Sequence, residues 1–405
     1  MKKPKKNYWE ERSRMSNIPK LRFPEFSGEW EEKKFSEIVY LENERDVCKK
    51  SDYITTENLN KDYAGVTFNT NSNEIVPGIK YLKDDILFGN IRPYLKKVWQ
   101  ADRNGCVNSD VLVFKIIKDN SKFINNIICS DLFLSHVMNG AKGTKMPRGD
   151  KNQMMDFIAK IPSLPEQQKI ADFLSNVDSI ITAETKILNT LQKRKKALMQ
   201  KLFTQQLRFK SDDGTDFPAW EERKLEDVCD IIGGGTPDTN KAEYWNGNIQ
   251  WFTPTEIGNT KYISESKRKI TQLGFEKSSA KLLPVGTILF TSRATLGEMS
   301  ITTVECTTNQ GFQSLIPNKN FIDPDYLYYL QPILQKYCYS KASGSTFLEI
   351  SAKSLKECHI PLPCKAEQQK IADCLSSLDS LIQTQQKVVT TWQQRKKALL
   401  QQMFI

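Results

Sequence analysis

Two stretches of the chain carry apolar residues mostly at every third or fourth position, the period of an amphipathic helix. The first stretch runs from Ile170 to Leu202 and the second from Ile371 to Met403. A helix of about 38 residues spans roughly 57 Å, and so long an apolar stripe needs a partner to cover it. The pattern therefore predicts two long helices that pair as an antiparallel hairpin.

We expect one set of apolar side chains to form the seam between these helices or an interface with partner chains. The set comprises Ile170, Leu174, Val177, Ile181, Leu188, Leu191, Leu198, Ile371, Leu375, Leu378, Ile382, Val389, Trp392 and Leu399.

The two helices differ in how clearly the sequence marks their starts. Ser163 and Glu166 have the spacing of a capping box, with Pro165 in the first turn, where its missing amide hydrogen does no harm. The second stretch has Cys364 in place of Ser163, so its start is less well specified.

The segments in front of the helices have a different pattern. Short β-rich runs such as 111–117 and 286–290 alternate with turn-forming clusters, and helical stretches fall at 122–139 and 324–341. Each segment has the size of one domain, which predicts a mixed α+β globule.

The chain contains an internal repeat. Glu166-Gln167-Gln168-Lys169-Ile170-Ala171-Asp172 recurs 201 positions later as Glu367 to Asp373, and Arg194-Lys195-Lys196-Ala197-Leu198 recurs as Arg395 to Leu399. Ahead of each copy stand a Leu-Arg-Phe triplet (21–23 and 207–209) and a Trp-Glu-Glu triplet (30–32 and 220–222). The order is therefore domain, helix, domain, helix.

Weaker landmarks align the two domains between these motifs. Ile86-Leu87-Phe88 matches Ile288-Leu289-Phe290, and Asn108 matches Asn309. Arg92 matches Arg293 and Gly143-Thr144 matches Gly344-Ser345 at the 201-residue offset of the helix motifs, whereas the Ile-Leu-Phe match departs from that offset by one residue. We predict a basic tail at 1–20, domains at 21–160 and 207–359, and helices at 161–206 and 360–405.

Composition narrows the class of protein. With 405 residues, 39% hydrophobic and 26% charged, the chain can bury two cores, which excludes disorder throughout. Nine cysteines without a C-x-x-C pair and only two histidines suggest neither a zinc ribbon nor a disulfide framework. A net charge of +10 favours a polyanionic partner. No apolar run reaches the ~18 residues of a membrane span, so we expect a cytoplasmic protein.

Enzymatic motifs are weak. The run from Gly233 to Asp238 lacks the third glycine of a dinucleotide fingerprint and the lysine of a P-loop, and Asp323-Pro324 is typical of a helix start. Asp238 with Glu265 leaves open an autonomous Mg²⁺-dependent DNA endonuclease. A structural coiled-coil scaffold is a further alternative.

Polar residues on expected loops form a stronger pattern, because they fall at matching places in both domains. Arginine and amide side chains suit base edges, and hydroxyls after a glycine suit phosphates. The candidate DNA-binding residues are Arg92, Tyr94, Lys96, Asn108, Ser109, Thr144, Lys145, Arg148, Thr236, Ser292, Arg293, Asn309, Gln310, Ser345 and Thr346.

The repeated motifs resemble one known family. The helix start from Pro162 to Ala171, its copy from Pro363, the Arg-Lys-Lys-Ala-Leu ends and the Leu-Arg-Phe and Trp-Glu-Glu triplets are similar to the specificity subunit of type I restriction-modification systems. The stretch from Gly234 to Trp251 resembles an opening of that family's target recognition domains. The resemblance covers nearly all the chain after residue 20.

The resemblance implies a non-catalytic DNA reader of α+β fold. Two target recognition domains would be related by a pseudo-two-fold axis and joined by two antiparallel coiled-coil spacer helices. Each domain would read one half of a bipartite asymmetric target in double-stranded DNA. Two methylation subunits and two restriction subunits would act on it, and S-adenosylmethionine, ATP and Mg²⁺ would bind those partners. No catalytic residue, metal or cofactor is expected in this chain.

Overall fold

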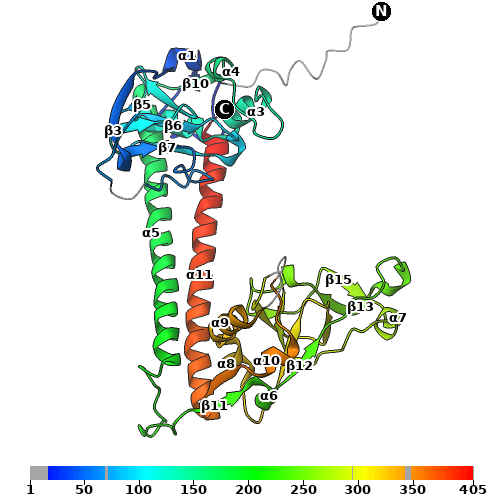
Figure 1. Ribbon diagram of the computed structural model, residues 1–405. Coiled ribbons are helices and arrows are strands. Elements are labelled where there is room, and N and C mark those ends of the chain that lie inside the picture. The colour runs from blue at the N-terminus through cyan, green and yellow to red at the C-terminus, as the bar shows by residue number, and fades with distance from the viewer. Residues whose placement is uncertain (1–16, 69–71, 294, 343–347, 405) are drawn as a thin grey trace, which may run out of the picture. The chain divides into compact units, whose positions relative to one another are not determined.

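The computed structural model describes residues 17–68, 72–293, 295–342 and 348–404, which fall into two compact units. The first unit combines the chain up to Lys186 with the chain from Gln386 onward, and the second is Ile187–Gln385. Each unit therefore contains one domain and one part of each long helix (Figure 1).

The long helices are α5 (Leu164–Phe203) and α11 (Lys365–Met403), each without interruption. In the first unit the start of α5 packs against the end of α11, because Leu174 shares a core with Met403. In the second unit the end of α5 packs against the start of α11, where Leu202 shares a core with Leu375. The helices are thus antiparallel within each unit, as the sequence predicted.

An ion pair joins the helices in each unit. Lys396 Nζ lies 2.6 Å from Asp178 in the first, and Lys195 Nζ lies 2.5 Å from Asp379 in the second. The paired residues are themselves 201 positions apart, so the repeat places the same bond twice. The apolar residues expected at the seam are all buried or half-buried, whereas Ile180, Ile187 and Leu381 are exposed.

The first domain contains two four-stranded sheets, a two-stranded sheet and short helices. One four-stranded sheet has the strand order β2 (Val39–Leu41), β9 (Val111–Ile116), β6 (Ile86–Gly89), β7 (Val98–Gln100). The other has the order β3 (Arg45–Lys49), β5 (Ile75–Tyr81), β8 (Gly105–Val107), β4 (Tyr53–Ile54). The two-stranded sheet pairs β1 (Glu31–Lys34) with β10 (Ile158–Ile161). The helices are α1 (Phe35–Ile38), α2 (Ser121–Ile128), α3 (Asp131–Asn139) and α4 (Lys151–Met155), with 3-10 turns η1 (Lys50–Asp52) and η2 (Pro93–Leu95).

The second domain repeats this plan with a five-stranded sheet. The five-stranded sheet has the strand order β12 (Cys229–Gly233), β19 (Gln313–Pro317), β16 (Ile288–Phe290), β17 (Met299–Thr302), β14 (Tyr262–Ile263). A three-stranded sheet has the order β15 (Arg268–Ile270), β13 (Trp245–Phe252), β18 (Cys306–Thr308). A two-stranded sheet pairs β11 (Glu221–Lys224) with β20 (His359–Leu362). The helices are α6 (Leu225–Val228), α7 (Gln272–Glu276), α8 (Pro324–Tyr329), α9 (Gln331–Lys341) and α10 (Ala352–Lys356), with η3 (Ala242–Tyr244) and η4 (Pro254–Glu256).

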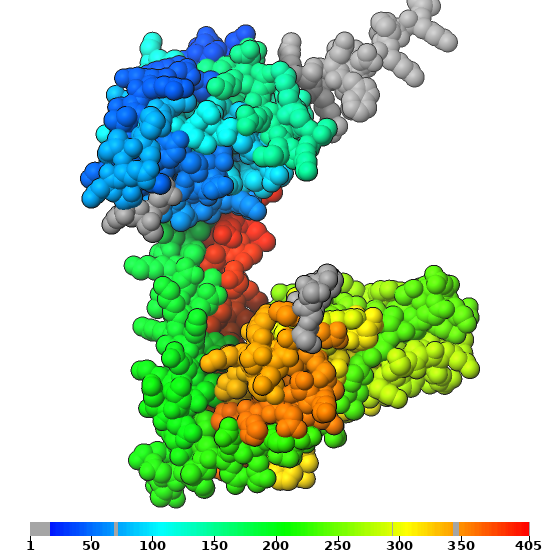
Figure 2. All heavy atoms as spheres, viewed as in Figure 1, coloured from blue at the N-terminus to red at the C-terminus, as the bar shows by residue number. Residues whose placement is uncertain are grey.

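The core of each domain extends onto the helices of its own unit. Phe123 of α2 shares a core with Ile170 of α5 and packs against Phe404, with the ring centroids 5.3 Å apart and the ring planes tilted by 35°. In Figure 2 the surface of the end of α11, in red, is continuous with that of the first domain. Since apolar burial is the main favourable term in folding, each domain and its helix segments form one stable body.

A buried ion pair fixes the start of each long helix. Arg22 donates to both carboxylate oxygens of Glu166 at 2.8 Å, and the Trp30 indole donates to the same group at 3.2 Å. The Glu166 side chain is only 2% exposed, and its bond raises the pKa of Arg22. The expected capping role of this glutamate is therefore replaced, because its carboxylate binds residues distant in the sequence.

The second unit forms the same ion pair. Arg208 donates to Glu367 at 3.1 and 2.7 Å, and the Trp220 indole donates at 2.8 Å. The repeated Leu-Arg-Phe, Trp-Glu-Glu and Glu-Gln-Gln motifs thus have one physical explanation: together they build the Glu–Arg–Trp clamp, which we define as Arg22, Trp30 and Glu166 and their copies Arg208, Trp220 and Glu367.

The next glutamine in each helix binds the domain itself. The Gln167 side chain accepts from the amide of Asn120, which caps α2, and donates to the carbonyl of Pro162 at 3.0 Å. Its copy Gln368 accepts from the amide of Asp323, the N-cap of α8. Both glutamines are at most 1% exposed. Each domain is therefore bonded to the first turn of the long helix that follows it.

Replacing Glu166 with alanine should lower the free energy of unfolding of the full chain by about 3–5 kcal/mol, because the largely covered guanidinium of Arg22 would lose its counter-ion. Urea denaturation followed by tryptophan fluorescence measures this. Glu32→Ala, at an exposed position of β1, is the matched control and should change stability by no more than about 0.5 kcal/mol. Equal effects of both substitutions would contradict the clamp's role.

Candidate nucleic-acid interface

Strand pairing shows which loop residues of the two domains are equivalent. The amide of Asn90 donates to Asp110 and the carbonyl of Asn90 accepts from Gly149. In the second domain Ser292 donates to Gly311 and accepts from Ile350 in the same way. Asn90 is therefore the counterpart of Ser292.

The proposed match of Arg92 with Arg293 is wrong by one residue. Ile91 pairs with Arg148, and Arg293 pairs with Glu349, so the counterpart of Arg293 is Ile91. The match of Asn108 with Asn309 is correct. The backbone amide of Asn108 donates to the carbonyl of Ile54, the last residue of β4, and that of Asn309 donates to the carbonyl of Phe252, the last residue of β13. The shift arises because the segment from Ile91 to Asn108 is one residue longer than the segment from Arg293 to Asn309.

Several expected residues of the first domain come together after β6. We call Asn90, Arg92, Asn108, Asp110 and Arg148 the first loop cluster. The amide of Arg92 donates to the carbonyl of Pro147 at 2.7 Å, which joins the turn after β6 to the segment before α4. Arg148 makes an ion pair with Asp110 at 3.0 Å, and Asp110 follows Asn108 by two residues.

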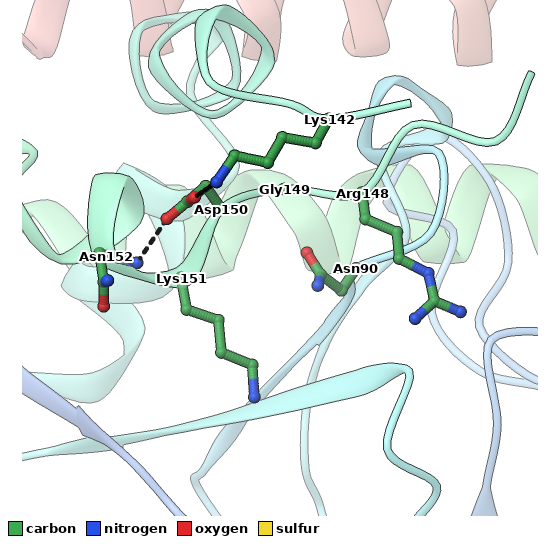
Figure 3. A pocket seen from close by; sticks show the side chains of 7 residues that line it. All are labelled: Asn90, Lys142, Arg148, Gly149, Asp150, Lys151 and Asn152. Atoms are coloured by element: carbon green, nitrogen blue, oxygen red, sulfur yellow. Dashed lines mark hydrogen bonds and ion pairs between the residues drawn. The ribbon is translucent and has the colours of Figure 1, made fainter. Parts of the chain in front are cut away.

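A hollow of about 500 Å³ opens beside the first loop cluster. It is lined by Asn90, Lys142, Arg148, Gly149, Asp150, Lys151 and Asn152. Figure 3 shows the Lys142 side chain reaching Asp150, while those of Arg148 and Lys151 extend away from that pair. The Lys142–Asp150 contact of 2.5 Å lowers the pKa of Asp150. Lys142 and Arg148 are each paired with a carboxylate, Asp150 and Asp110, so Lys151 adds the positive charge that suits an anionic ligand at this hollow.

Other expected residues lie around this cluster. Thr144 and Lys145 are exposed in the turn between Lys142 and Arg148, whose backbones pair across it. Tyr94 is 47% exposed, and Ser109 is exposed beside Asn108. These four side chains are accessible to a ligand.

Lys96 has a structural partner. Its ammonium lies 3.3 Å from Asp131 and 5.7 Å from the centre of the Tyr63 ring. Burial works against the charge of Asp131, yet the bond from Lys96 lowers the pKa of this carboxyl below its ordinary value. Lys96 therefore serves the packing of α3 rather than an open surface.

The second domain gathers its expected residues in the same place. We call Thr236, Ser292, Arg293, Asn309 and Gln310 the second loop cluster. The Thr236 hydroxyl donates to the side chain of Gln310, and Asn309 accepts from the amide of Gly311 at 2.8 Å. A Cβ at Gly311 would lie 3.0 Å from the Asn309 side chain and 3.4 Å from that of Arg293. Ser345 and Thr346 lie outside the described residues.

The glycines before Thr236 allow close backbone packing. A Cβ at Gly234 would come within 2.0 Å of the Asn309 carbonyl oxygen, and one at Gly235 within 2.4 Å of Ala280. Only glycine fits such approaches. The Gly-rich run therefore holds the β12 end against the loop of Asn309 and Gln310.

Buried atoms without a partner mark both clusters. Among the described residues, these atoms include Asn90 Oδ1, Arg92 Nε and Asn108 Oδ1 in the first cluster and Ser292 Oγ in the second. An unsatisfied buried polar group costs about 1–3 kcal/mol, so these positions favour a polar ligand or water. Sequence reasoning missed Asn90, although the ends of the matched Ile-Leu-Phe strands could have identified it as the partner of Ser292.

The residues of the nuclease alternative have other contacts. Asp238 accepts from the amide of Asn240 at 3.0 Å, and Glu265 lies 3.5 Å from Lys269. Within the described ranges, no group of three or more His, Cys, Asp or Glu residues could hold a metal ion. None of the helices in the described part of the chain has the length and apolar character of a membrane-spanning segment.

Comparison with known proteins gives consistent relatives. A stretch of 190 residues, 46% of this chain, is 41% identical to the type I restriction enzyme MjaIX specificity subunit of Methanocaldococcus jannaschii, and covers 44% of that protein. A stretch of 171 residues, 40% of this chain, is 32% identical to the EcoR124I/EcoR124II specificity subunit of Escherichia coli, and covers 41% of it. The chain thus spans less than half the length of these relatives.

A solved structure shares the fold along nearly the whole chain. A chain from a study of complex assembly and conformational transition of the type I R-M system has a TM-score of 0.60 and 18% sequence identity, and the match covers 92% of this chain and 96% of that one. At this identity the likeness establishes the fold alone.

The family model for the type I restriction modification DNA specificity domain matches twice, at residues 27–193 and 219–391. Each match spans one domain and most of the helix that follows it, in agreement with the repeated clamp. The chain therefore belongs to the type I restriction-modification DNA specificity domain family.

Proposed function

We propose that this chain is the DNA sequence-recognition subunit of a type I restriction-modification complex. It is non-catalytic, reads a bipartite asymmetric target, and directs adenine methylation and restriction by partner subunits. The observation that carries the proposal is the recurrence of one polar loop cluster at equivalent strand ends of two repeated domains.

The two clusters differ in chemistry, which supports different half-sites. Asn90 carries an amide where Ser292 carries a hydroxyl, and Arg148 takes the place of Glu349. Amides pair well with adenine edges and guanidinium groups with guanine or phosphate. Domains that share a backbone but differ at these positions would read different bases.

The partner subunits would supply the chemistry. Two methylation subunits would bind S-adenosylmethionine, and two restriction subunits would use ATP and Mg²⁺. Ile180, Ile187 and Leu381 expose 37, 48 and 54% of their surface on the long helices, and exposed apolar residues of this kind suit contacts with other chains. A cytoplasmic location is part of the proposal.

Exchanging residues 21–160 for the matching domain of another family member should change one half of the methylated motif and leave the other half and the spacer unchanged. The chimera is co-expressed with its methylation subunit, and methylated adenines are mapped across the genome. A continuous motif for the parent chain, or changes in both halves for the chimera, would contradict the proposal.

Removing the cations Arg148 and Lys151 together should weaken DNA binding about equally for all sequences. The slope of log affinity against log salt should fall by about 0.9 for each phosphate that the variant no longer neutralises. Fluorescence anisotropy of the complex with the methylation subunit measures both quantities on a labelled duplex. Lys387→Ala, at an exposed position on α11, is the control and should retain the parent slope.

A further inference from the structure

The second unit contains a lysine that is almost completely buried. Lys261 precedes β14, and its side chain is only 7% exposed. Lysines are rarely buried unless they are paired, because removing an ammonium from water is costly. The contacts of Lys261 must therefore offset the free-energy cost of removing its charge from water.

The ammonium of Lys261 binds both the domain and a long helix. It lies 2.8 Å from Asp325 of α8 and donates to Ser376 of α11 at 2.7 Å. It also donates to the Tyr329 hydroxyl at 3.2 Å and lies 4.4 Å from the centre of that ring. One charge thus joins β14, α8 and α11.

Tyr329 extends the network to the other helix. Its hydroxyl donates to Asp379 of α11 at 2.7 Å, and Asp379 accepts from Lys195 of α5 at 2.5 Å. Burial raises the pKa of Tyr329, which keeps this hydroxyl a hydrogen-bond donor. The network therefore bonds the second domain to both helices of its unit.

The backbone at Lys261 is also fixed. Its carbonyl accepts from the amide of Ile301 at 2.7 Å, and the next residue begins β14, which pairs with β17. The lysine thus connects the edge of the five-stranded sheet directly to α11. A rotation of the sheet about the helix would break several charge-assisted bonds at once, and these are among the stronger bonds in proteins.

The first unit is docked by a different network. There Asp131 of α3 binds Lys96, and its other oxygen lies 3.4 Å from Gln401 and 3.9 Å from Lys397 of α11. The Asp131 side chain is 44% exposed, so water screens these bonds. In the second unit, by contrast, the lysine that bonds the domain to α11 is buried.

We infer that Lys261 is a positioning residue that holds the second recognition domain at a fixed angle on α5 and α11 and so restricts the spacer length between the two half-sites. This inference rests on the proposed function. One additional base pair moves a half-site by about 3.4 Å and rotates it by about 35°. Only a rigidly docked domain can reject that displacement.

The test replaces Lys261 with methionine, which keeps the length and apolar body of the side chain but removes its charge. The variant is co-expressed with the methylation subunit, and methylation is mapped at sites whose spacer is one base pair longer or shorter. We expect methylation at these sites to rise about tenfold relative to the parent chain, the effect of removing a hydrogen bond to a charged group. Both half-site sequences should stay unchanged.

Tyr329→Phe and Ser376→Ala are milder variants, each of which removes one hydroxyl from the network. If Lys261→Met yields no methylation, these two variants test the inference instead, by the same mapping of methylation at sites with a longer or shorter spacer. Lys269→Met, at a lysine of β15 whose partner Glu265 is largely exposed, is the matched control and should leave the spacer preference unchanged.

The outcomes separate the inference from the function on which it rests. Full methylation with an unchanged spacer preference in the network variants overturns the inference, as does a change in the bases of the second half-site. A parent chain that directs no two-part methylation overturns the proposed function itself. A relaxed spacer with unchanged half-sites supports the inference.

Discussion

The buried bond between Glu166 and Arg22, repeated as Glu367 with Arg208, is the interaction on which the rest of the structure depends. Each carboxylate is almost completely removed from water and is satisfied by an arginine and a tryptophan indole. A carboxylate at this depth is tolerated only with such partners. The clamp therefore fixes where the chain enters each domain relative to the start of the long helix that follows it. The other contacts between domain and helix depend on this placement.

From the clamp, two kinds of constraint extend in each unit. Gln167 and Gln368 bind the caps of α2 and α8, so one helix of each domain is placed relative to the long helix. The apolar core then continues onto α5 and α11. Loops that follow β6 and β16 have a rigid support, and their side chains are free to differ because they contribute little to folding.

The sequence predicted the repeat and the antiparallel helices because both depend on local periodicity and on motifs long enough to align. It assigned Glu166 a capping role because the spacing to Ser163 is local, whereas its real partner Arg22 is 144 residues away. It misaligned Arg92 with Arg293 because a one-residue shift between weak landmarks is invisible without strand pairing. Asn90 was missed although the offset of the matched Ile-Leu-Phe strands places it opposite Ser292.

The polar residues of the chain divide into two groups by burial and by recurrence. Those buried at the helix starts recur almost unchanged, because replacing any one of them would leave a partner unsatisfied in the core. Those at the loop clusters differ between the domains, and several keep buried atoms without a partner, which leaves bonding capacity for a ligand. Lys261 belongs to neither group, since it is buried, whereas the corresponding charged contact between domain and α11 in the first unit is made by the exposed Asp131. This asymmetry shows that the two domains diverged in how they are held as well as in what they present.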